Sequence, residues 1–139
     1  MKLNLGCGKD IREGYTNLDK RDWGQDIVRD VLKGLPFDNN KFDEVLASHF
    51  LEHIRNGENL YFVFTEIWRV LKNDGLLIVR LPHSESPEAF YPDHLSYWNE
   101  KMLTAMVNDP YQSYGKYDFD VVEMKREGFE FRFILKAKK

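Results

Sequence analysis

The sequence has a single cysteine, no long apolar run and no large excess of charge of one sign, and each of these excludes a class of protein. The one cysteine, Cys7, excludes a disulfide framework and a cysteine-based zinc site within the monomer. No apolar run is long enough for a signal peptide or a membrane span. We therefore expect a cytoplasmic protein with no membrane partner.

The charges nearly cancel, because 20 lysines and arginines face 23 aspartates and glutamates for a net charge of −3. Such a total gives no general attraction to nucleic acid. Of the 139 residues, 42% are hydrophobic and 31% are charged, which is ordinary for a globular protein. We expect a single domain spanning residues 1–139 and no nucleic-acid partner.

Apolar residues alternate between the strand period and the helix period, which favours an α/β layer fold. Short strands are expected at 3–5, 15–18, 26–31 and 42–48. A helix is expected at 59–71, ended by Asn73-Asp74-Gly75, before an apolar run at 76–81 that is typical of a central parallel strand. After a loop at 82–98, we expect a helix at 99–107 and an antiparallel pair of strands at 117–124 and 129–138.

The segment 3–19 places a glycine turn directly after the first strand. Gly6 and Gly8 let the backbone turn sharply and let a ligand approach the main chain. The second strand ends at Asp19, whose carboxylate can accept hydrogen bonds from both hydroxyls of a ribose. The connection between Gly8 and Asp19 is too short for a crossover helix, so no helix N-terminus is expected there to bind a pyrophosphate. A nucleoside without phosphates fits these residues better than NAD or FAD.

A second carboxylate, Asp30, follows the third expected strand. It can accept a hydrogen bond from the exocyclic amine of adenine, and the neighbouring backbone N–H can donate to a ring nitrogen. The glycine turn, Asp19 and Asp30 thus come from three successive strand ends, where open α/β sheets bind their ligands. Together they predict a pocket for an adenosine that carries an amino acid.

Four segments in order resemble the class I S-adenosylmethionine (SAM) dependent methyltransferases, in a small branch with a shortened first crossover. They are LNLGCG, GYTNLD, DVLKGLPFDNNKFDEVLASHFLEH and EIWRVLKNDGLLIVRLP, and they span roughly residues 3–82. The resemblance implies a Rossmann-like, doubly wound and mostly parallel sheet with a C-terminal antiparallel hairpin and reduced helix cover. It also implies that the chain is an enzyme whose cofactor is SAM.

The resemblance further implies cofactor-binding roles at four strand ends. These are Gly6, Cys7 and Gly8 at the methionine end of SAM, Asp19 at the ribose hydroxyls, Asp30 and Val31 around the adenine, and Ser48 and His49 beside the amino-acid and sulfonium region.

Methyl transfer from SAM is an in-line displacement, and a base helps when the acceptor is a hydroxyl or a protonated amine. Histidine titrates near neutral pH, and His49 is the first candidate because it lies closest to the expected cofactor site. His83, just after the fifth strand, is the second. Glu52, His53 and His94 are further candidates, with a structural role as the alternative for each histidine. We assign no metal-binding residues.

The expected acceptor is a small molecule or a saccharide-like compound. The chain lacks the Asn/Asp-Pro-Pro-aromatic segment and the Pro-Cys nucleophile of enzymes that methylate nucleic-acid bases. The segment 82–98 is expected on the acceptor side, where its aromatic residues either wall the pocket or cover the sheet: Phe90, Tyr91, Tyr97 and Trp98. Trp23 and Trp68 are expected to pack in the interior.

Two alternatives to a free-standing enzyme follow from departures from the family pattern. The first strand begins at Leu3 and the first connections are short, so part of one sheet face is expected to lack cover. A second copy of the chain or a partner subunit would fill it, and a non-catalytic SAM-binding subunit that regulates or stabilises a partner is the first alternative. A nucleotide-sugar or dinucleotide-binding domain is the second.

Overall fold

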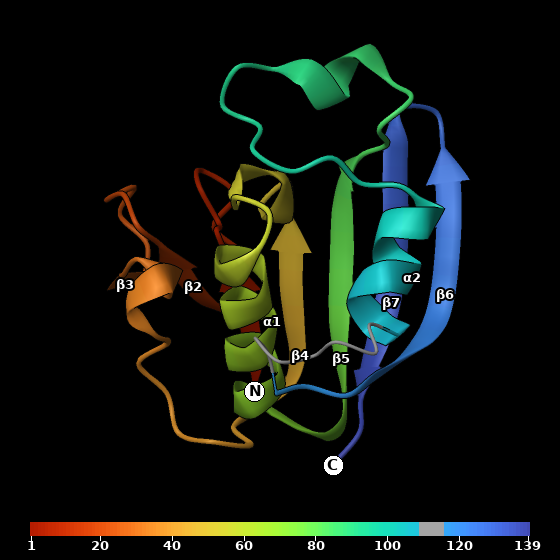
Figure 1. Cartoon of the computed structure of the whole chain (residues 1–139). Helices are drawn as coiled ribbons and strands as arrows, with labels where there is room; N and C mark the ends of the chain where they lie inside the picture. The colour runs from red at the N-terminus through yellow and green to blue at the C-terminus, as the bar shows by residue number, and fades with distance from the viewer. Residues whose placement is uncertain (109–115) are drawn as a thin grey trace.

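A computed structural model describes residues 1–108 and 116–139 (Figure 1). Its strands form one sheet in the order β3-β2-β1-β4-β5-β7-β6. Their bounds are β1 (Lys2–Leu5), β2 (Thr16–Asp19), β3 (Ile27–Val28), β4 (Phe42–Ser48), β5 (Leu71–Pro82), β6 (Phe119–Glu127) and β7 (Glu130–Ala137). Strands β1 to β5 pair in parallel, whereas β7 is antiparallel to both β5 and β6. The predicted Rossmann-like sheet with a C-terminal antiparallel hairpin is confirmed.

Two helices, α1 (Glu58–Val70) and α2 (Glu100–Asn108), pack on the sheet, as the apolar spacing of their sequences predicts. The buried stripe of α1 recurs at three and four residues, which places it on one face of the helix: Leu60, Val63, Phe64, Ile67 and Val70. Single 3-10 turns lie at Val31–Lys33, Leu51–His53 and Pro87–Phe90. No helix in the described ranges combines the length and apolarity that a membrane crossing requires.

The expected end of α1 is displaced in the structure. Asn73-Asp74-Gly75 does not stop the helix, because α1 ends at Val70 and the chain enters β5 at once. Residues 72–74 instead form an irregular start of this strand, and pairing with β4 shifts between Phe42 and Glu44. A Cβ atom at Gly75 would lie 2.9 Å from the Lys72 carbonyl oxygen, so the glycine serves the bulge rather than a helix end.

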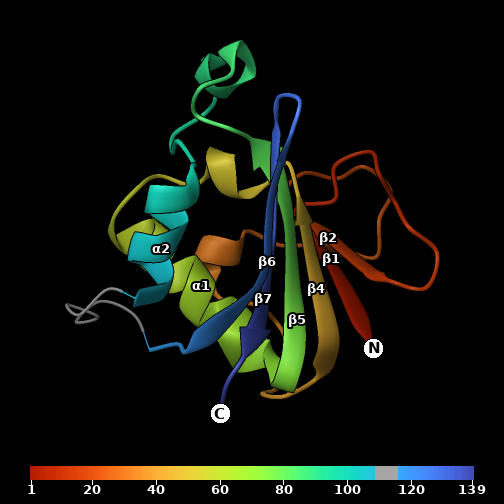
Figure 2. The ribbon, with the colours of Figure 1, turned by 90° about the vertical axis from the view of Figure 1, so that its right-hand side faces the viewer.

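One face of the sheet carries both helices, and the described residues place no helix on the other (Figure 2). The alternation along β5 shows the difference, because Leu77 and Val79 are fully buried while Ile78 and Arg80 stay partly exposed. The predicted reduction of helix cover is confirmed.

The interior on the helix side is built around Trp98, which is fully buried. Its ring stacks between Phe64 of α1 and Phe133 of β7, with ring centroids 6.1 and 5.7 Å apart. Of the two roles expected for Trp98, the structure therefore supports cover of the sheet rather than the wall of a pocket. Trp68 packs against the core as predicted, and its indole N–H donates to the carbonyl of Lys138.

Candidate functional site

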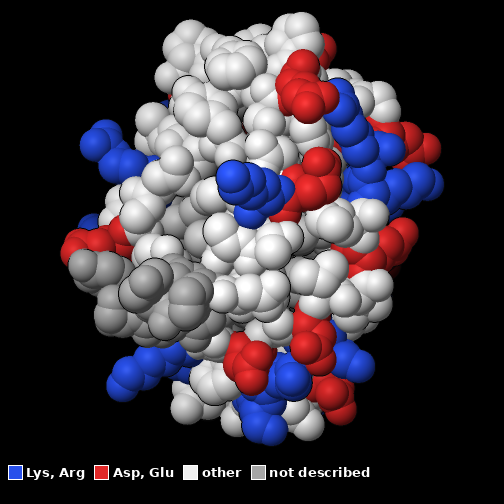
Figure 3. Space-filling model, turned by 45° about the vertical axis from the view of Figure 1, so that its right-hand side comes forward, with Lys and Arg blue, Asp and Glu red and all other residues white. Residues whose placement is uncertain are grey.

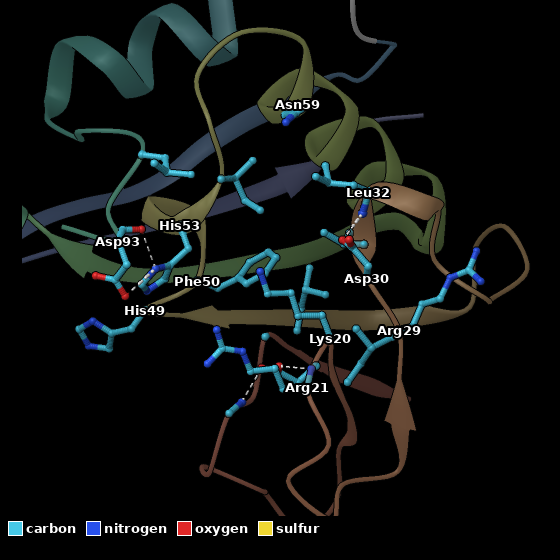
Figure 4. A pocket seen from close by; sticks show the side chains of 18 of the residues that line it. Lys20, Arg21, Arg29, Asp30, Leu32, His49, Phe50, His53, Asn59 and Asp93 are labelled. Atoms are coloured by element: carbon cyan, nitrogen blue, oxygen red, sulfur yellow. Dashed lines mark hydrogen bonds and ion pairs between the residues drawn. The ribbon is translucent and has the colours of Figure 1, made fainter. Parts of the chain in front are cut away.

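A cavity of about 590 Å³ opens where β1, β2, β3 and β4 end (Figure 4). This volume is within the usual range for small-molecule pockets. Gly6 and Gly8 line it from the turn after β1, and Asp19 lines it from the end of β2. Asp30 and Val31 follow β3, and the segment after β4 supplies the opposite wall. The cavity thus lies at the carboxyl ends of the parallel strands, as an open α/β sheet predicts.

The glycine turn is fixed by the backbone and by one aromatic ring. Gly6 and Gly8 have φ angles of 67° and 53°, in the left-handed region that favours glycine. The amide of Gly6 donates to the carbonyl of Leu18 at 2.8 Å, which closes the turn against β2. A Cβ atom at Gly6 would lie 2.1 Å from the ring of Phe50, so that ring occupies the space a side chain would need. Phe50 is a residue of the site that sequence reasoning missed.

Asp19 holds the turn through both of its carboxylate oxygens. Oδ2 accepts from the amide of Gly8 and Oδ1 accepts from the amide of Arg21, each at 2.9 Å. Each carboxylate oxygen has two lone pairs, so each can accept one further hydrogen bond, and Asp19 lines the cavity. Asp30 is similarly anchored, because its Oδ1 accepts from the amide of Leu32 at the start of a 3-10 turn. This cap also explains why β3 is shorter than the strand expected at 26–31.

Trp23 and four cationic side chains were not anticipated in the cavity wall. Trp23 is 39% exposed and lines the cavity, so its predicted packing role is wrong. The cations that line the same space are Lys20, Arg21, Arg29 and Arg55. The ammonium and guanidinium groups of these side chains can donate hydrogen bonds to a carboxylate of a bound ligand.

Two of the expected cofactor residues lie beside the cavity rather than in its wall. Cys7 is buried, and its thiol donates to the carbonyl of Gly8 at 3.4 Å. Burial and the nearby Asp19 carboxylate raise the pKa of Cys7 to about 11, so the thiol is neutral at physiological pH. Ser48 is the last residue of β4, partly buried and paired with Arg80 of β5.

His49 follows β4 with a left-handed φ of 54° and lines the edge of the cavity. Its Nδ1 lies 3.6 Å from Glu52 Oε2, and its Nε2 lies 3.2 Å from Glu130 Oε1. The Glu52 carboxylate is the main cause of a raised pKa of His49, burial opposes this rise, and Glu130 adds to it. Glu130 also pairs with Arg80 at 3.0 Å, which ties His49 into a charged network that spans β4, β5 and β7.

His83 does not reach the cavity. Its ring is 1% exposed and packs edge-on against Phe131. Nδ1 accepts from the amide of Glu85 at 3.1 Å, which leaves Nε2 to donate to Glu100 Oε1 at 2.8 Å. Both ring nitrogens therefore have partners in the fold, and the structure does not bring this histidine to the other expected site residues.

The segment 83–98 covers the upper end of the molecule (Figures 1 and 3). It carries exposed apolar side chains, among them Phe90 and Tyr97, whose rings stack at 5.4 Å. Asp93 and Leu95 of the same segment line the cavity, and Figure 4 shows Asp93 beside His53. This segment therefore borders the end of the cavity opposite Asp30.

Comparison with known proteins agrees with this geometry. Residues 7–79, more than half of the chain, match the model of a family described as the methyltransferase domain. No curated protein matches the sequence.

Several solved structures share the fold at low sequence identity. One is the Burkholderia thailandensis 1,6-didemethyltoxoflavin-N1-methyltransferase with bound 1,6-didemethyltoxoflavin and S-adenosylhomocysteine, with 16% identity and a TM-score of 0.72 over 99% of this chain and 71% of that chain. A SAM-dependent methyltransferase from Methanosarcina mazei has 14% identity and a TM-score of 0.71 over 99% and 92%. A putative methyltransferase in complex with the Trm112 methyltransferase activator of Haloferax volcanii has 14% identity and a TM-score of 0.68 over 99% and 82%.

Proposed function

The chain belongs to the methyltransferase domain family and its cofactor is SAM, and from this premise we propose that it transfers the methyl group of SAM to a small-molecule or saccharide-like acceptor. The observation that carries the proposal is the convergence of Gly6, Asp19 and Asp30 from three strand ends on one cavity of about 590 Å³. A cavity of this size suits a nucleoside with an attached amino acid.

The residues of the cavity fit SAM in the proposed order. At Gly8 a Cβ atom would meet nothing within 4 Å, so the absence of a side chain there gives the methionine part close access to the backbone. Asp19 would accept from the ribose hydroxyls, and Asp30 would accept from the adenine amine, with Val31 against the ring. Lys20 and Arg21 supply positive charge for the carboxylate of the methionine part.

When bound, SAM supplies a methyl group on a positively charged sulfur, and this sulfur is the leaving group when an acceptor atom attacks the methyl carbon from the opposite side. The chain contributes by holding the acceptor in line with the methyl group, which removes a large entropic barrier. His49 is the base we propose for an acceptor that must lose a proton. Glu52 and Glu130 flank its two ring nitrogens and would stabilise the imidazolium that forms. We do not extend this role to His83, because it is buried and does not line the cavity.

The acceptor is proposed to enter between the segment 83–98 and the turn after β4. Asp93 and Leu95 place one carboxylate and one apolar side chain in the cavity wall there. The same segment carries the stacked, exposed rings of Phe90 and Tyr97. A small heteroaromatic acceptor, like the one bound to the Burkholderia enzyme, or a sugar would suit such a mixed surface.

A SAM-binding subunit that acts through a partner is the second candidate, and the bare face of the sheet favours it. The described residues leave Ile78 and Arg80 partly exposed on that face. The Haloferax complex provides a precedent in which a methyltransferase fold is bound by an activator.

Transfer of a labelled methyl group tests the proposal. The purified chain would be incubated with methyl-labelled SAM and a panel of phenols, heteroaromatic amines and saccharides, and the label in each acceptor would be counted. Labelling of a panel member above the boiled-protein control supports the enzyme. Tight binding of SAM with no labelled product over the whole panel would contradict it and favour the non-catalytic subunit.

A further inference from the structure

A second group of polar side chains, Glu52, His53 and His94, lies beside the cavity, and the methyl-transfer proposal uses only Glu52 of these, as a neighbour of His49. One metal-ligating atom of each residue lies within 4.8 Å of the other two. Glu52 and His53 belong to the 3-10 turn after β4, whereas His94 comes from the segment 83–98. We propose that these three residues bind a divalent transition-metal ion of the zinc class.

Glu52 gives independent evidence that a cation belongs here. The residue is 2% exposed, and its Oε1 has no hydrogen-bond partner among the described residues. An unpaired carboxylate oxygen in the interior costs free energy, because burial removes its hydration without replacing it. A bound cation would supply the missing partner.

The two histidines are held in a tautomer that leaves Nε2 for a metal ion. His53 Nδ1 lies 3.2 Å from the carbonyl oxygen of Asp93, and His94 Nδ1 lies 3.1 Å from the carbonyl oxygen of Ala89. A carbonyl only accepts, so each Nδ1 carries the proton and each Nε2 keeps its lone pair. Backbone carbonyls orient metal-binding histidines in this way. Asp93 Oδ1 lies 4.0 Å from Nε2 of His94, so a second carboxylate borders the proposed site.

The ligand set selects the class of ion. Two imidazoles and one carboxylate suit Zn²⁺ and its transition-metal neighbours, whereas Mg²⁺ and Ca²⁺ prefer oxygen ligands. Ligand atoms around tetrahedral zinc are about 3.4 Å apart, as bonds of about 2.0–2.1 Å require. The three side chains would therefore close in by up to about 1.4 Å, and the 37% exposed side chain of His53 has room to turn.

Three protein ligands leave one coordination position for a ligand from outside the chain. His53 and Asp93 both line the cavity, so this position lies on its acceptor side. An acceptor hydroxyl bound there would lose its proton more easily, because a zinc ion lowers the pKa of a bound hydroxyl. Binding of the ion is independent of the proposed function, whereas this use of it rests on that function.

Zinc binding can be measured without SAM or an acceptor. The full chain, with any histidine tag removed, would be stripped with a chelator, and Zn²⁺ binding would be followed by calorimetry and by metal content after dialysis. We expect one Zn²⁺ per chain, unaffected by excess Mg²⁺. The variants Glu52→Gln and His53→Gln should each weaken binding by at least about tenfold.

The pair of Glu100 and His83 provides a matched control, because it also joins a carboxylate to a buried histidine, at 2.8 Å. Glu100→Gln should leave zinc affinity unchanged. The proposal is overturned if the wild type binds no stoichiometric zinc, or if Glu52→Gln and His53→Gln bind zinc as tightly as the wild type. His94→Gln should also weaken zinc binding. Because His94 is buried, its affinity is compared only after circular dichroism shows that this variant folds like the wild type.

Discussion

Replacing Gly6 by alanine is expected to lower the free energy of unfolding for two separate reasons, backbone strain and a steric clash. The backbone has φ of 67°, and an L-residue in this left-handed region costs about 1–2 kcal/mol. The new Cβ would also lie 2.1 Å from the ring of Phe50, and overpacking of this kind costs typically about 1–3 kcal/mol. We expect Gly6→Ala to lower the free energy of unfolding by about 2–5 kcal/mol and to weaken cofactor binding.

Gly14 separates the two parts. Its φ is 82°, but a Cβ atom there meets nothing within 4 Å, so Gly14→Ala carries the backbone cost alone. Urea unfolding of both variants gives the steric part as a difference. Adding Phe50→Ala should recover much of that part in the Gly6→Ala background, because it removes the ring atoms at 2.1 and 2.6 Å and leaves only the Cβ atom at 2.9 Å. A double-mutant cycle would show this coupling. Equal losses for the two glycine variants, or no coupling with Phe50, would refute the reasoning.

Three further predictions address individual side chains. The thiol of Cys7, with its pKa raised to about 11, should resist iodoacetamide at pH 8 in the folded protein and react in urea; rapid labelling of the native state would contradict this. If neutral His49 is the base, kcat/KM should rise with pH through its raised pKa, above 6.5, and Glu130→Gln should move this rise to lower pH; a pH-independent rate would contradict the role. Trp98→Ala should lower the free energy of unfolding by about 3–5 kcal/mol, because Trp98 is fully buried. Trp23→Ala should change it by no more than about 0.5 kcal/mol, because Trp23 is exposed, and should weaken SAM binding. Equal losses of stability in urea unfolding would contradict this difference in burial.

The parts of the fold that follow from local patterns were predictable. The apolar spacing in 59–71 identifies α1, because a stripe at three and four residues has one simple solution. The run 76–81 identifies the centre of β5, because such an apolar run is typical of a strand within a sheet. The burial expected on both faces is found on one only, since Ile78 and Arg80 stay partly exposed. The glycine turn and the position of Asp19 at the end of β2 follow from the same reading.

The parts that depend on segments far apart in the chain were not predictable. Nothing in the local sequence places the ring of Phe50 over Gly6, since 44 positions separate them and the contact arises from the packing of β4 beside β1. Trp23 is apolar and aromatic, which favours the core by composition, but its loop carries it to the cavity edge. His83 looked accessible because it follows a strand end, yet Glu100 of α2 covers its ring nitrogen.

The cavity at the strand ends is the proposed SAM site, and every cofactor-binding residue proposed for this chain depends on it. Calorimetric titration of S-adenosylhomocysteine into the wild type, Asp19→Ala and Asp22→Ala tests it. Asp22 is the matched control, because it also accepts from a backbone amide, that of Gly24 at 3.0 Å, but does not line the cavity. We predict one binding site in the wild type and in Asp22→Ala, and binding at least about tenfold weaker in Asp19→Ala, since hydrogen bonds to a charged group contribute about 1.5–3 kcal/mol. Unchanged affinity in Asp19→Ala would contradict the assignment of the site.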